Sequence, residues 1–181
     1  MIIKVKNISF IDYFNLENKT KYNYYLRYAE LVPTDLFKIG SLMDQSFGFV
    51  KDVQDLFYTS GLTWEKYFEL IVELKGLKKE TIANNKLFQL HASRLYLKEQ
   101  IEQITELERS NLGHASNAKE QMAGIEVFDK YGAFLQFDSL ANGDVTKIKE
   151  IEKLDYSVCF AKLKLESDSS KFQIELNKLN K

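Results

Sequence analysis

The sequence has few of the side chains that most enzyme active sites use. Its 181 residues include one cysteine and two histidines, and no motif brings these three together. Glycine-rich phosphate loops and the nucleophile motifs of hydrolases are missing as well. We therefore expect a protein that is not an enzyme, with no catalytic residue, no cofactor, no metal site and no small-molecule substrate. The alternative is an active site that only folding assembles, around His91 or Cys159.

The chain also has little proline, no pair of cysteines that could form a disulfide, and no excess of one sign of charge. Pro33 is the only proline, so no later residue forces a helix to end. Cys159 has no partner within the chain, and its apolar neighbours predict a buried side chain in a reducing compartment. The formal net charge of -1 excludes the strongly basic balance of a general nucleic-acid binder.

Long apolar runs are absent too. No window approaches the roughly 20 apolar residues that span a bilayer, and the first residues lack the apolar core of a signal peptide. We therefore expect a protein without membrane contact that lies in the cytoplasm.

What the sequence does have is apolar side chains at helical spacing. Hydrophobic residues make up 45% of the chain and aromatic residues 13%, which is ample for a packed core. Steps of three and four residues between apolar positions predict an all-α fold, an irregular multi-helix bundle. Because no repeat or flexible linker divides the chain, we expect residues 1–181 to form a single helical domain.

Start and stop signals divide the chain into predicted helices. The clearest are residues 41–59, residues 64–75 between a Thr63 cap and Gly76, residues 81–111 as the long central helix, and residues 117–131. Short helices follow as far as Leu165. The polar run at residues 167–170 then predicts a separate C-terminal helix within residues 167–181, which projects or docks. Residues 1–8 predict a short N-terminal strand or an arm.

Two charged patterns have simple explanations. Glu65, Glu69 and Glu73 share one helix face and could in principle bind a metal, but no histidine has the spacing that completes a di-iron site. We interpret them as a solvated face. His91 and His114 lie far apart in sequence, and neither is part of a recognisable triad.

Aromatic residues carry the binding hypotheses. Residues 19–28 interleave tyrosines with Lys19, Lys21 and Arg27, a pattern that can stack bases and neutralise phosphates. Half-buried tyrosines at a protein interface are the favoured interpretation, and a nucleic-acid-binding accessory protein is the alternative. The residues that we expect to anchor an interface are Tyr13, Tyr22, Tyr25, Trp64 and Phe68.

The carboxyl-terminal third carries a resemblance to a known group of proteins. Residues 122–126, Tyr131-Gly132, Gly143-Asp144-Val145 and residues 151–158 follow in an order that resembles small helical proteins of tailed-phage structural modules, tail-assembly chaperones among them. The resemblance covers about residues 120–165 and rests on apolar spacing and a Gly-Asp turn. It implies a non-enzymatic role in building a virion or its tail. If a phage encodes the chain, the expected location is the host cytoplasm and the virion.

Together these observations predict a protein-protein interaction or assembly component, such as a phage structural or tail-assembly protein. The expected partners are other proteins, which include virion or tail components and further copies of the chain. Nucleic acid is the less favoured partner.

Overall fold

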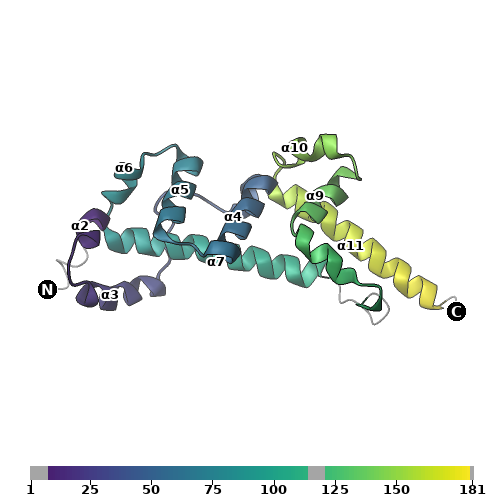
Figure 1. Ribbon diagram of the computed structural model, residues 1–181, viewed down its shortest axis with the longest axis horizontal. Coiled ribbons are helices and arrows are strands. Elements are labelled where there is room, and N and C mark those ends of the chain that lie inside the picture. The colour runs from purple at the N-terminus through teal and green to yellow at the C-terminus, as the bar shows by residue number, and fades with distance from the viewer. Residues whose placement is uncertain (1–7, 114–120, 180–181) are drawn as a thin grey trace. The chain divides into compact units, whose positions relative to one another are not determined.

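The computed structural model describes residues 8–113 and 121–179 of this protein (Figure 1). Within these ranges the regular structure consists of α-helices and 3₁₀-helices, and no strand is present there beyond the two isolated bridges Ser9 to Lys86 and Ser46 to Asp155. The predicted all-α fold is confirmed. The predicted N-terminal strand or arm lies almost wholly outside the described residues.

Thirteen helical elements lie wholly within the described residues. In chain order they are α2 (Phe10–Phe14), α3 (Thr20–Leu26), η1 (Arg27–Leu31), η2 (Leu42–Asp44), α4 (Phe47–Ser60), α5 (Trp64–Lys75), α6 (Lys79–Ala83), α7 (Leu87–Leu112), η3 (Ile125–Tyr131), α9 (Phe134–Ala141), η4 (Val145–Lys147), α10 (Ile148–Ile151) and α11 (Tyr156–Leu179).

The chain divides into two compact units. Unit 1 comprises Met1–Ser41 and Val53–Glu102, and unit 2 comprises Leu42–Asp52 and Gln103–Lys181. The helices α4 and α7 therefore contribute residues to both units. Each unit has its own buried apolar residues, which include Tyr67, Ile71, Leu90 and Leu97 in unit 1. In unit 2 they include Leu42, Phe47, Val50, Ile151, Tyr156 and Leu163.

Helix α5 forms where the sequence predicts it. The Thr63 hydroxyl accepts a hydrogen bond from the backbone N–H of Lys66, and Gly76 ends the helix in the left-handed conformation with φ 62°. Tyr67, Phe68 and Ile71 are buried on its apolar face. Local cap chemistry and apolar spacing agree here, so the sequence was sufficient to place both ends.

The long helix begins later than predicted. Residues 79–83 form the separate helix α6, and α7 begins only at Leu87, after a break at Asn84-Asn85-Lys86. The Asn85 side chain donates to the carbonyls of Thr81 and Ile82, which ends α6. Lys86 then bridges to Ser9, so tertiary pairing holds this residue out of a helix.

Two further helix predictions need correction. Residues 167–170 lie inside the continuous helix α11 rather than between two helices, and the Ser167 hydroxyl donates to the carbonyl of Asn111 at the end of α7. The predicted helix of residues 117–131 has its start outside the described residues. Its second half is the 3₁₀-helix η3, which follows Gly124 at φ 78°.

Candidate functional site

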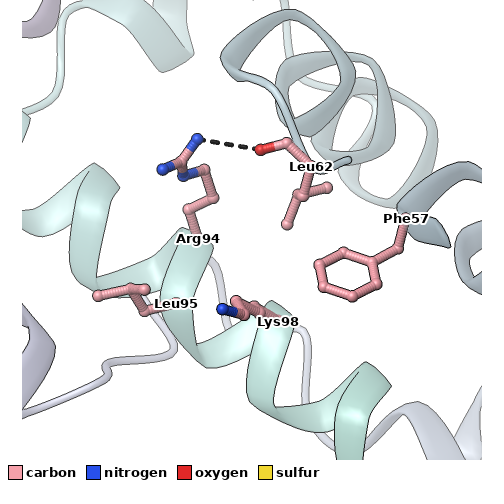
Figure 2. Close-up of a pocket in the computed structure, with 5 residues that line it drawn as sticks. All are labelled: Phe57, Leu62, Arg94, Leu95 and Lys98. Carbon is pink, nitrogen blue, oxygen red and sulfur yellow. Dashed lines mark hydrogen bonds between the residues drawn. The ribbon is translucent and has the colours of Figure 1, made fainter. Parts of the chain in front are cut away.

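Unit 1 contains a pocket of about 210 Å³. Figure 2 shows its lining, in which Phe57 comes from α4, Leu62 from the connection between α4 and α5, and Arg94, Leu95 and Lys98 from α7. We call these five residues the cationic pocket. Its walls combine three apolar side chains with two positive charges.

Arg94 is held firmly at the edge of this pocket. Its Nη1 donates to the Leu62 carbonyl at 3.0 Å (Figure 2). Its guanidinium carbon also lies 4.5 Å from the centroid of the Trp64 ring. Burial lowers the pKa of Arg94 below its usual value, and the negative charge that Tyr67 can carry opposes this. In the part of the chain that the structure describes, no carboxylate lies within 4.0 Å of this guanidinium.

Trp64, which the sequence predicts as an interface anchor, belongs to an aromatic cluster behind Arg94. Its ring centroid lies 4.8 Å from that of Phe10, and Phe10 lies 4.9 Å from Phe68. Phe68, another predicted anchor, is only 9% exposed, whereas Trp64 is half-buried. The cluster therefore orients the indole face against which Arg94 rests.

The predicted tyrosine anchors lie in the N-terminal part of unit 1. The Tyr13 hydroxyl donates to the side chain of Asn23 on α3, and the rings of Tyr13 and Tyr22 lie 6.2 Å apart. Lys19 lies 5.9 Å from the Tyr13 centroid, so this cation already faces a ring of its own segment. Tyr25 lies in α3, but its side chain is outside the description. The structure thus brings Tyr13 and Tyr22 together and leaves Trp64 and Phe68 in a different cluster.

His91 and Cys159, around which an enzyme's active site was the alternative hypothesis, are both buried. His91 is 9% exposed beside Trp64, and its Nδ1 has no hydrogen-bond partner among the described residues. Burial lowers its pKa, Arg94 lowers it further, and Glu30 opposes the shift. Cys159 is 1% exposed, and burial, with a contribution from Asp155, raises the pKa of its thiol above the usual value. His114 lies outside the described residues.

Unit 2 contains a buried charged group that the sequence did not reveal. Lys51 is 5% exposed, and its Nζ lies 2.6 Å from Glu108 Oε1, which also accepts a hydrogen bond from the Tyr156 hydroxyl. The ammonium lies 5.4 Å from the centroid of Phe47 and 5.9 Å from that of Tyr156. Burial lowers the pKa of Lys51 although Glu108 opposes the shift, and burial together with Glu108 raises that of Tyr156.

No metal centre emerges from the acidic row on α5. Glu69 pairs with Lys66 at 3.0 Å and with Lys79 at 3.8 Å, while Glu65 and Glu73 are exposed. Across residues 8–113 and 121–179, no group of three or more His, Cys, Asp or Glu side chains is arranged to hold a metal ion. In the same ranges, no helix is both long and apolar enough to cross a membrane.

Helix α11 displays a row of exposed apolar side chains. Val158, Leu165, Phe172 and Leu179 recur at every seventh residue, and their exposed fractions are 58%, 65%, 62% and 84%. A seven-residue step brings a helix back to nearly the same direction, so these four side chains share one face. We call them the apolar stripe.

A row of charges runs beside the stripe on α11. Lys164, Asp168, Lys171, Glu175 and Lys178 alternate in sign at steps of four and three residues. Lys178 pairs with Glu175 at 2.6 Å, whereas Lys164 and Lys171 donate to the side-chain and main-chain oxygens of Asn111. Because steps of three and four residues return to the same side of a helix, these five charged side chains also share one face of α11. We call them the charged row.

Comparison with protein-family models, with curated proteins and with solved structures finds no match to this chain. The three most distinctive features of the described residues are the cationic pocket, the buried Lys51 with Glu108, and the apolar stripe.

Sequence reasoning missed all three of these features, for different reasons. The pocket joins Phe57, Leu62 and Arg94 across three elements, and no local pattern signals such a meeting. The stripe did leave a signal, because its seven-residue period is visible in the sequence once residues 156–179 are taken as one helix. The expected break at residues 167–170 concealed that period.

Proposed function

We propose that this protein is a non-enzymatic component of a protein assembly, and that α11 joins one copy of the chain to another. The observation that carries the proposal is the apolar stripe, since four exposed apolar side chains in register along one helix are unusual on a surface without a partner. Burying them against a second helix removes apolar area from water, which is the main favourable term in association.

The charged row favours a second copy as the partner. In an antiparallel pair related by a twofold axis, like sides of the two helices face each other. A register that places Lys164 opposite Glu175 of the second copy also places Asp168 opposite Lys171, and it interleaves the two apolar stripes. Lys164, Asp168, Lys171 and Glu175 then each face an opposite charge on the other copy, and this selects one orientation.

The biological setting that we propose comes from the resemblance of residues 120–165 to helical proteins of tailed-phage structural modules. In that setting the assembly is a virion, a tail or an intermediate in building one. The buried positions of His91 and Cys159 support a binding role over an enzymatic one.

Light scattering after size exclusion, over a range of protein concentrations, tests the association. We expect a dimer or larger oligomer for the wild type and a monomer for the double variant Leu165→Ser/Phe172→Ser, because both exchanges remove apolar area from the stripe. Gln173→Ser is the matched control, since Gln173 is an exposed polar residue of the same helix, and it should associate like the wild type.

Two results would remove this proposal. One is a wild type that stays monomeric at every concentration, and the other is a double variant that keeps its helicity and still associates as the wild type does. The phage setting has its own test, which is mass spectrometry of purified virions from a phage that encodes this sequence. Absence of the chain from virions and from tail-assembly intermediates would refute that setting alone.

A further inference from the structure

We propose that the cationic pocket binds a carboxylate carried on an apolar body. Two of its five lining residues, Arg94 and Lys98, are cations one turn apart on α7, and the other three, Phe57, Leu62 and Leu95, are apolar (Figure 2). This site belongs to unit 1 and is separate from the association that α11 supports.

Arg94 supplies the strongest argument. A guanidinium has five N–H donors, and in the described part of the chain only the Leu62 carbonyl takes one of them. The Trp64 ring, 4.5 Å from the guanidinium carbon, and the Leu62 carbonyl hold the group in place before a ligand arrives. Because Arg94 is half-buried and has no acidic partner among residues 8–113 and 121–179, it would gain most from an anion that enters the pocket.

Lys98 adds a second positive charge beside the same cavity. It lies 3.6 Å from Glu102, and both side chains are about half exposed, so this ion pair is weak and easily rearranged. The pocket can therefore present two cations to one ligand, with Arg94 as the fixed group and Lys98 as the adaptable one.

The apolar side chains that line the rest of the pocket determine which class of anion it can bind. A planar carboxylate matches the fork of a guanidinium with two parallel hydrogen bonds. A phosphate or sulfate would have unpaired oxygens against the apolar side chains of Phe57, Leu62 and Leu95. A ligand with an apolar body would instead place that body against these side chains. The volume of about 210 Å³ fits a group of the size of one ring or one short side chain.

The first experiment titrates the wild-type chain with phenylacetate and with phenylacetamide, its neutral isostere. Two readouts are Trp64 fluorescence, because Trp64 is the only tryptophan and touches Arg94, and the side-chain N–H resonance of Arg94. We expect phenylacetate to bind at least about tenfold more tightly than phenylacetamide, since it alone forms charge-assisted hydrogen bonds. Equal affinities, or no binding by phenylacetate, would overturn the proposal.

Variants locate the binding in the pocket. Arg94→Gln should weaken phenylacetate binding by about tenfold and Lys98→Gln by less, whereas Lys78→Gln, an exposed lysine of unit 1 outside the pocket, should leave it unchanged. If Arg94→Gln unfolds, the Lys98→Gln variant and the comparison of phenylacetate with phenylacetamide still test the proposal. Folded variants that both bind like the wild type would place the anion elsewhere and refute the assignment.

A carboxylate on an apolar body can belong to a partner protein or to a free small molecule, and binding of short peptides distinguishes the two. A short peptide with a glutamate next to a leucine, compared with its glutamine counterpart, tests a partner protein as the source. Tighter binding by the glutamate peptide than by phenylacetate would indicate an acidic segment of a partner. Binding of phenylacetate alone would indicate a free small carboxylate.

Discussion

At the scale of single residues, Lys51 is the least expected feature of this protein. It lies on the buried face of α4, one turn after Phe47, where an apolar side chain would continue the helical pattern. Glu108 and two aromatic rings surround its ammonium instead. The sequence could not predict this, because the carboxylate that makes burial tolerable lies 57 residues away on another helix.

We predict that Lys51→Met destabilises the fold although methionine suits a buried position. The exchange removes the cation that lies 2.6 Å from the largely buried Glu108 carboxylate, and breaking a buried ion pair in this way typically costs about 3 kcal/mol. Urea unfolding followed by circular dichroism measures the change in the free energy of unfolding.

The double variant Lys51→Met/Glu108→Gln serves as the control for this prediction. Its glutamine can still accept the Tyr156 hydrogen bond but carries no charge, so we expect the double variant to regain at least half of the lost stability. The single variant Glu108→Gln completes the comparison. If the stability losses of Lys51→Met and Glu108→Gln simply add in the double variant, then Lys51 and Glu108 do not stabilise each other, and the interpretation of the pair is wrong.

At the scale of elements, the accuracy of sequence prediction depended on where the controlling interactions lie. Helix α5 was predicted at both ends because the Thr63 cap and Gly76 are local signals. The start of α7 was wrong because a pairing between Ser9 and Lys86, distant in sequence, shortens it. Helix α11 was wrongly divided because serines disfavour a helix only weakly, and the contact of Ser167 with Asn111 supports it there.

Gly48 shows how a neighbouring element can oppose helix propensity. It lies in the first turn of α4, and its N–H donates to the Glu152 carbonyl at 2.9 Å. A Cβ at this position would lie 3.0 Å from the Glu152 Cβ and 3.1 Å from its carbonyl oxygen. The close approach of these two backbones therefore requires glycine.

We predict that Gly48→Ala lowers the free energy of unfolding by about 1 kcal/mol. Propensity alone would raise it by about the same amount, but overpacking against residue 152 costs more than the helix gains. Chemical denaturation measures the effect, and Thr59→Ala, an exposed exchange on the same helix, should change stability by no more than about 0.5 kcal/mol. A Gly48→Ala protein more stable than the wild type would mean that α4 and residue 152 are not in close contact.

At the scale of the whole molecule, the question is whether the two compact units unfold together. The sequence predicts a single domain, and the backbones of α4 and α7 each continue without interruption from one unit into the other. Breaking such a helix at the boundary would expose backbone groups that are hydrogen-bonded within it, and this opposes unfolding of one unit alone. We therefore predict one cooperative transition.

The only tryptophan makes this prediction measurable. Trp64 lies in unit 1, so its fluorescence reports on that unit, whereas far-ultraviolet circular dichroism reports on the helices of both. The two transitions in denaturant should coincide in midpoint and in slope. Gly48→Ala sharpens the test, because it acts in unit 2 and should nevertheless shift the Trp64 transition as far as the circular dichroism transition. A Trp64 midpoint that stays fixed while the circular dichroism midpoint falls would show that the units unfold separately.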